Sequence, residues 1–273
     1  MKRVFRRGAF CVLAFVALMA LLAPVIAPYD YSRQFREAPN AQASGRFPMG
    51  TDDLGRDRFS RLIYATRLSI VLAPAAALVS ILIALLISAL AATRATWAGH
   101  FLAGFTTLSM SLPWIFLFII LRALLPLSTR PMQSILITFG LMGIAGWAWP
   151  ARIFTASIRQ MLQSAWLLQA RAAGVSNGRI ARVHAWPHLR SIAIAQFRVL
   201  SPAYILSEAS LGLLGLGVAE PLPSWGNLLA ELQHPSRVHD NPWILAPLAL
   251  LMVVMIALEA LQPTRKTAAQ VIA

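Results

Sequence analysis

Two histidines, His184 and His188, have a spacing that could do chemistry. They stand four positions apart, a separation that places two imidazoles on one helix face in zinc proteases of the HExxH type. Pro187 lies between them, and the glutamate of that motif is absent. We therefore predict no metal site here, and we expect the chain to need no cofactor.

Motifs of other catalytic sites are also missing. A phosphate-binding loop requires a lysine after a glycine-rich turn, and the only lysines, Lys2 and Lys266, lie outside such a setting. No apolar span contains a GxSxG nucleophile motif. The one cysteine, Cys11, cannot form a disulfide within the chain. These observations predict a protein that is not an enzyme.

Charged residues within or near apolar spans are the next candidates for function. They are Arg122, Arg198, Glu208 and Glu259. A charge in hydrocarbon is costly and usually faces a partner or water. Arg122 and Glu259 stand near span ends, where long side chains reach the interface. Glu208 is deeper, among small residues such as Gly212 and Gly215 that permit close helix packing. A structural role and a pore role both remain open for it.

Residues 169–189 form the most distinctive connection between two apolar spans. This stretch and the adjoining position carry four arginines and no acid: Arg171, Arg179, Arg182 and Arg190. Residues 168–173 are good helix formers, and Gly174 can end that helix with a positive φ. Ser176 can cap a second helical piece, which we expect Pro187 to break. The pattern predicts a basic helix-turn-helix suited to press into a partner.

The composition indicates an integral membrane protein. The 273 residues are 58% apolar and 12% charged, whereas soluble domains carry about 25% charge. Several apolar runs reach the roughly 20 residues needed to cross a bilayer. The net charge of +14 does not come with exposed aromatic platforms in a polar domain, so we do not expect nucleic-acid binding.

The apolar runs predict six transmembrane helices. Their ranges are 8–27, 68–92, 101–125, 132–149, 191–218 and 243–262. With the N-terminus inside, segments 1–8, 93–99, 150–190 and 263–273 hold 13 basic residues and no acidic ones. Arginine-rich inner loops are the usual pattern. We therefore expect both termini in the cytoplasm, and Pro24 and Pro28 argue against signal-peptide cleavage.

Four regions follow from these spans. Residues 1–28 form the N-terminus and first helix, and 29–67 an external loop with an amphipathic lead-in helix at 59–68. Residues 68–262 form a five-helix core that includes the loop at 150–190, and 263–273 form a cytoplasmic tail. The expected fold class is all-α, a polytopic membrane protein with a short cytoplasmic helix between the fourth and fifth spans.

Three ordered motifs mark this sequence. In the first, Gly174 follows Ala170 by four positions and Pro187 follows Gly174 by thirteen. The second, GTDDLGRDRFSRLIYATRL, is at 50–68, and the third, ILSEASLGLLGLGVAEPLPSWGN, is at 205–227. In this order they resemble the cytoplasmic coupling loop, the segment before the second span, and the fifth span with its following loop in permeases of ABC importers of the dipeptide/oligopeptide/nickel family.

The resemblance implies an ATP-driven importer that moves short peptides across the bacterial inner membrane by alternating access. This chain would be one permease subunit, paired with a second and different permease. Two cytoplasmic ATPase subunits would hydrolyse ATP, and an external binding protein would deliver the substrate. The same machinery could instead carry nickel or another small solute. A non-transporting membrane scaffold and a secondary transporter are the alternatives from other classes.

The resemblance also implies which residues carry function. Coupling to the ATPase would involve Leu168, Gln169, Ala170, Arg171, Gly174, Arg179, His184 and Pro187. The fifth span would lie beside the translocation path, with Glu208, Gly212 and Gly215 as candidates. One departure stands out, because Leu168 occupies the usual acidic position six residues before the glycine. That change leaves the loop unusually basic.

Overall fold

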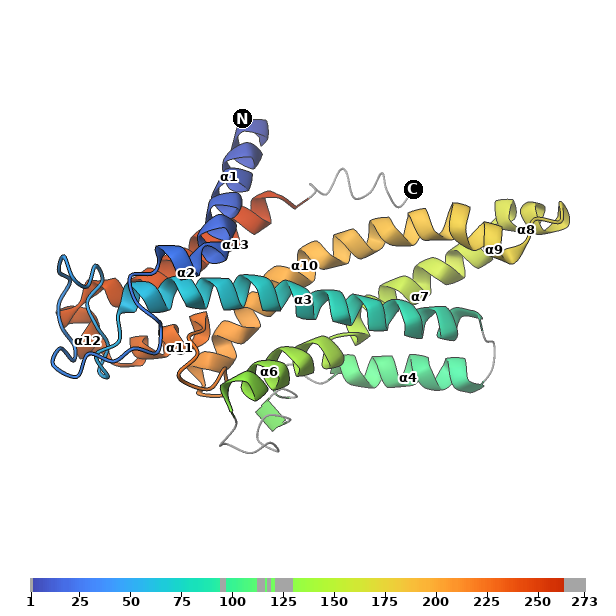
Figure 1. Cartoon of the computed structure of the whole chain (residues 1–273). Helices are drawn as coiled ribbons and strands as arrows, with labels where there is room; N and C mark the ends of the chain where they lie inside the picture. The colour runs from blue at the N-terminus through green and yellow to red at the C-terminus, as the bar shows by residue number, and fades with distance from the viewer. Residues whose placement is uncertain (1, 94–96, 112–115, 117–118, 121–129, 263–273) are drawn as a thin grey trace. The chain divides into compact units, whose positions relative to one another are not determined.

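The computed structural model describes residues 2–93, 97–111, 116, 119–120 and 130–262. These residues form helices and connecting loops, and their only bridge pair joins Thr51 and Asp57. The α-helices, labelled in Figure 1 where there is room, are α1 (Lys2–Leu21), α2 (Ala23–Ile26), α3 (Arg58–Thr93), α4 (Trp97–Ser111), α6 (Pro131–Ala145), α7 (Ala148–Leu162), α8 (Ala165–Ala172), α9 (Asn177–Ile180), α10 (Trp186–Leu213), α11 (Trp225–Ala230), α12 (Pro235–Asp240) and α13 (Ala246–Ala260). The fold is therefore all-α, as predicted.

Four helical stretches in the described part are long and apolar enough to cross a membrane. They are Val4–Leu21, Arg58–Ala91, Pro131–Leu162 and Pro242–Ala260. The predicted fifth span corresponds to α10, which has 28 residues and a length of about 42 Å at 1.5 Å per residue. The first half of the predicted third span is α4, whereas Pro113 and Arg122 lie outside the described residues. The chain is a polytopic membrane protein.

Two helices extend beyond their predicted limits. The expected lead-in at 59–68 is continuous with the second span, because α3 begins at Arg58 and contains Pro74 without interruption. The fourth span does not end at Trp149. After a turn at Gly146 and Trp147, α7 continues it to Leu162.

The chain divides into two compact units. Unit 1 comprises residues 1–73, 127–138 and 205–273, and unit 2 comprises residues 74–126 and 139–204. In unit 1, α1 packs along α13, the blue and red helices of Figure 1. The loop between α2 and α3 in unit 1 has its own aromatic cluster, in which Phe35 contacts Tyr29 and Phe47 with ring centroids 4.8 and 5.0 Å apart.

Serine side chains connect the helices of unit 2. The Ser80 hydroxyl lies 2.6 Å from the Tyr204 hydroxyl and donates to the Gly143 carbonyl at 2.7 Å. Further along α3, the Ser88 hydroxyl donates to the Ala151 carbonyl at 2.9 Å. Buried hydroxyls thus satisfy backbone carbonyls near the turn between α6 and α7, where regular helix bonding is interrupted.

Candidate functional site

Gly174 ends α8 through a Schellman turn. Its φ is 75°, and its N–H donates to the Arg171 carbonyl at 3.0 Å. The Val175 N–H donates to the Ala170 carbonyl, also at 3.0 Å, which completes the motif. A Cβ at Gly174 would meet nothing within 4 Å. Glycine is therefore needed here for its backbone conformation alone, and the predicted bend is confirmed.

The second helical piece differs from the prediction at both ends. Ser176 precedes α9, but its side chain makes no capping hydrogen bond. Our prediction that Pro187 breaks this piece is wrong, because α9, the π-helical turn η1 (Ala181–Ala185) and α10 follow one another directly. Proline lacks an N–H and its ring collides with the carbonyl four residues earlier. The wider π turn just before Pro187 relieves that conflict.

Residues 165–187, which we call the basic segment, are mostly exposed (Figure 1, the yellow stretch at α8 and α9). The predicted coupling residues on its surface are Leu168, Gln169, Arg171, Gly174, Arg179, His184 and Pro187, and Ala170 is half-buried. Three apolar residues anchor the segment: Leu167, Ile180 and Ala185 are buried. The basic segment is therefore anchored by buried apolar side chains, whereas most of its other side chains are exposed.

The two histidines contact different partners. The His184 ring lies against Trp166, with centroids 5.1 Å apart, so it connects η1 to α8. The His188 Nε2 lies 2.9 Å from the Ser157 hydroxyl and connects α10 to α7. Both contacts are within unit 2. They hold the basic segment at the ends of α7 and α10.

Glu208 is fully buried in unit 1. Its Oε2 accepts a hydrogen bond from the Ser69 hydroxyl at 3.0 Å, and its Oε1 accepts one from the Gly226 N–H at 3.3 Å. A buried carboxyl group is tolerated when its oxygens are bonded in this way. Of the two roles left open, this arrangement provides the structural one, because Glu208 joins α3 and α11 to α10. A role in the path stays a prediction.

Glycines let α10 and α11 approach closely. A Cβ at Gly226 would lie 2.7 Å from the Gly212 Cα and 2.6 Å from the Glu208 carbonyl oxygen. Gly215 ends α10 with a φ of 73°, and its N–H donates to the Gly212 carbonyl at 2.9 Å. The two glycines predicted to line the path therefore also have structural roles. Gly212 allows close helix packing, and Gly215 forms the turn that ends α10.

A largely buried ion-pair network, which the sequence did not predict, connects the loop before α3 to the segment after α10. The Arg56 Nε donates to Asp52 at 2.6 Å, and its Nη1 donates to Glu220 at 2.6 Å. Arg61, only 2% exposed, donates to Glu220 at 2.9 Å. Burial lowers the pKa of the Arg56 guanidinium, but Asp52 and Glu220 outweigh it, so the pKa lies above its ordinary value.

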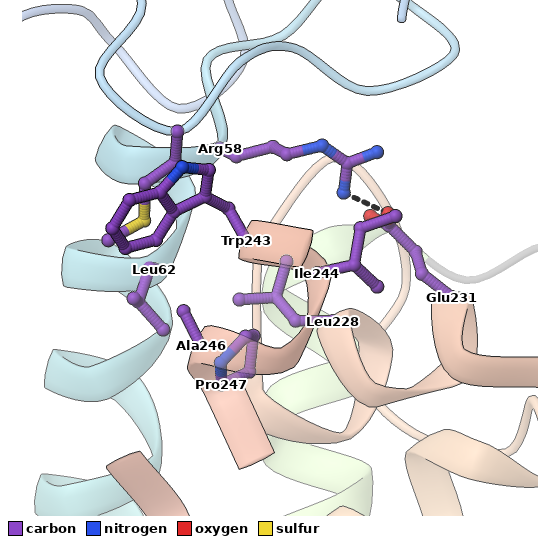
Figure 2. Close-up of a pocket in the computed structure, with 9 residues that line it drawn as sticks. Arg58, Leu62, Leu228, Glu231, Trp243, Ile244, Ala246 and Pro247 are labelled. Carbon is purple, nitrogen blue, oxygen red and sulfur yellow. Dashed lines mark hydrogen bonds and ion pairs between the residues drawn. The ribbon is translucent and has the colours of Figure 1, made fainter. Parts of the chain in front are cut away.

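Arg58 forms a separate ion pair at a small pocket (Figure 2). Arg58 forms an ion pair with Glu231 at the pocket edge. The rest of the lining is apolar: Met49, Leu62, Leu228, Trp243, Ile244, Ala246 and Pro247. The two charged groups of this lining pair with each other. The pocket thus joins the N-terminal end of α3 to α11 and the start of α13.

The second and third sequence motifs meet in unit 1. Besides the ion pairs of Arg56 and Arg61 with Glu220, the Trp225 indole N–H donates to the Thr66 hydroxyl at 3.1 Å. Trp225 itself is 0% exposed. The two motifs, at 50–68 and 205–227, therefore build one contact region. Each motif could be recognised in the sequence, but the contacts between residues of the two motifs could not be predicted from it.

Comparison with known proteins identifies the family. Residues 81–263 match the family described as binding-protein-dependent transport system inner membrane component. Residues 8–43 match the N-terminal TM domain of oligopeptide transport permease C.

Individual relatives agree with that assignment. The chain is 30% identical to the di/tripeptide transport system permease protein DppC of Pseudomonas aeruginosa (strain UCBPP-PA14), over 82% of this chain and 74% of the relative. It is 29% identical to the oligopeptide transport system permease protein OppC of Bacillus subtilis (strain 168), over 81% and 70%. Identity to OppC of Escherichia coli (strain K12) is 29%, over 91% and 80%. The chain belongs to the family of inner membrane components of binding-protein-dependent transport systems.

Proposed function

We propose that this chain is a permease subunit of an ATP-driven importer of short peptides. The relatives named for di-, tri- and oligopeptide transport support the choice of cargo. Nickel or another small solute is the alternative cargo, because the external binding protein selects much of what such a machine carries.

The observation that carries the proposal is the glycine-bent basic segment. Gly174 joins two short helical pieces through a turn with a positive φ. Leu167, Ile180 and Ala185 are buried, and most other side chains of the segment are exposed. Such an element can transmit a push from a docked subunit into α7 and α10. The residues that we assign to coupling are Leu168, Gln169, Ala170, Arg171, Gly174, Arg179, His184 and Pro187.

The mechanism would be a population shift between inward- and outward-facing states. ATP binding closes the ATPase pair, and the basic segment moves with it. The permease then favours one state because the docked ATPase makes different contacts in each. The complex would contain a second permease, two ATPase subunits and an external binding protein, with both termini of this chain in the cytoplasm. The path role of Glu208, Gly212 and Gly215 remains part of this proposal.

The test is Gly174→Val, because a β-branched residue is strained at a positive φ. In complexes reconstituted with partner subunits, we expect ATP hydrolysis to continue while peptide uptake falls by about tenfold or more, since strain of 1–3 kcal/mol distorts the bend. The matched control is Gly178→Val, whose Cβ also meets nothing within 4 Å but whose φ is not positive. Wild-type uptake by Gly174→Val would refute the coupling role.

A further inference from the structure

The arginines of residues 29–67 fall into a paired and an unpaired set. Seven arginines lie in this range. Four of them form ion pairs with carboxylates: Arg46, Arg56, Arg58 and Arg61. Arg33, Arg36 and Arg67 are exposed, and in the part of the chain that the structure describes none of them forms an ion pair. Because arginine stays protonated at any physiological pH, these three side chains can receive an anion from outside the chain.

Arg67 marks the boundary between the polar and the apolar part of α3. The 26 residues 68–93 contain no aspartate, glutamate, lysine or arginine. At 1.5 Å per residue they extend for about 39 Å, which is enough to cross a hydrocarbon core of roughly 30 Å. Before Arg67, α3 buries polar side chains such as Arg61 and Thr66. An exposed arginine at such a boundary places its charge at the level of the lipid phosphates.

Two tyrosines bring the loop between α2 and α3 to the same level. The Tyr31 and Tyr64 rings lie edge to face, with centroids 5.0 Å apart. Tyr64 is three residues before Arg67 in α3, so the two side chains share a helix face. Tyr31 comes five residues after the end of α2 at Ile26, and Arg33 follows it closely. Tyrosine is enriched at membrane–water interfaces. The tyrosine pair therefore joins two chain segments where both leave the apolar region.

The surroundings of these side chains suit an amphiphile. The Arg33 Cζ lies 4.8 Å from the centroid of the Phe35 ring and 5.6 Å from that of the Tyr29 ring. Such cation–π contacts restrict the side chain while its charge stays without a carboxylate. On α3, Val71 is one turn beyond Arg67 on the same face and is 50% exposed. Cationic donors are thus followed along the helix by an exposed apolar side chain.

We propose that Arg67 and Arg33, together with Tyr31 and Tyr64, bind the headgroup of an anionic phospholipid. The guanidinium groups donate charge-assisted hydrogen bonds to the phosphate oxygens, and an acyl chain lies along α3 at Val71. Phosphatidylglycerol suits the site better than phosphatidylcholine, because the choline ammonium would be repelled by the arginines. This inference requires only that the chain spans a membrane, so it does not depend on the proposed transport function.

The experiment is photo-crosslinking of the full-length permease in phosphatidylcholine liposomes. The probe is a small fraction of phosphatidylglycerol that carries a diazirine in its acyl chain, and mass spectrometry measures the adducts on residues 68–75. We expect Arg67→Gln to lower the adduct yield about fivefold, since one basic residue near anionic lipid contributes about that factor. Adding Arg33→Gln should lower the yield about 25-fold in total. Arg67→Lys should keep most of the yield because it keeps the charge.

Two controls separate lipid binding from a general loss of structure. Arg46→Gln makes the same charge change in the same loop, but Arg46 already pairs with Glu37 at 3.2 Å. We expect this variant to keep the yield within about twofold, since an exposed pair contributes little. Adducts at Met252, an exposed residue of α13, should stay unchanged in every variant. An unchanged yield on residues 68–75 in the Arg33→Gln/Arg67→Gln variant would overturn the inference.

Competition identifies the chemistry of the occupant. Unlabelled phosphatidylglycerol should displace the probe at least about fivefold more effectively than unlabelled phosphatidylcholine, and equal displacement would contradict an anionic lipid. Glycerol 3-phosphate, which lacks acyl chains, should not displace the probe. If it displaces the probe as well as the lipid does, the site takes a soluble phosphate and the inference is wrong. The inference is also wrong if Arg67→Gln releases a co-purifying protein subunit while the adducts persist.

Discussion

Two sets of arginines, one in each unit of this permease, differ in burial. In unit 1, which holds all ten acidic residues of the chain, Arg56 and Arg61 are buried and paired with Asp52 and Glu220. In unit 2, which has no acidic residue, Arg171 and Arg179 are exposed. A buried charge is stable only with its partner present. Burial therefore separates arginines that stabilise the fold through ion pairs from arginines whose side chains are exposed on the surface.

The largest effect should come from the buried side of this comparison. Arg56→Met removes one partner of Asp52, which is 1% exposed, and leaves its charge undercompensated. We expect a loss of about 3 kcal/mol in the free energy of unfolding, at the low end for broken buried pairs because Arg61 stays nearby. The change in midpoint of denaturant unfolding in detergent measures it.

Arg152→Met is the control for that measurement in unit 2, because Arg152 is exposed. We expect a change within about 0.5 kcal/mol, as for most surface substitutions. Equal losses in the two variants would contradict the distinction between the units.

A smaller effect should come from packing. Gly212→Ala in unit 1 places a Cβ 2.8 Å from the Asn227 nitrogen of α11, and overpacking of this kind costs about 1–3 kcal/mol. Gly140→Ala is the matched change in a helix of unit 2, where the added Cβ meets nothing within 4 Å. It should be neutral or slightly stabilising, because alanine favours helix over glycine. The same denaturant assay compares the free energies of unfolding of the two variants. An unchanged free energy for Gly212→Ala would show that close packing does not require glycine at this position.

Local signals in the sequence predicted local structure well. Gly174 ends its helix with a positive φ, and the first and last apolar runs are helices of spanning length. In both cases the determinant is contained in a short stretch of chain: the backbone freedom of one glycine, or the hydropathy of one run. The family assignment also followed from three short motifs, and its match covers residues 81–263.

Structure that depends on distant partners was not predictable. Arg56 and Glu220 are 164 positions apart, and no periodicity in either segment indicates the pair. The helical continuation through Arg152 and Arg159 reads as a polar loop by hydropathy. It is amphipathic instead, with Phe154 and Ile158 buried on one face. The passage of helix through Pro187 depends on the π turn before it, which no sequence rule anticipates.

Sidedness of the basic segment tests the account most directly. In a Cys11→Ala background, a cysteine at Arg179 would be treated with a membrane-impermeant maleimide in right-side-out and inverted vesicles. A cysteine at Arg36 serves as the external control, since both native side chains are exposed. We expect Arg179→Cys to be labelled only in inverted vesicles and Arg36→Cys only in right-side-out ones. Labelling of Arg179→Cys in right-side-out vesicles would contradict it, because no cytoplasmic ATPase could then reach the bend.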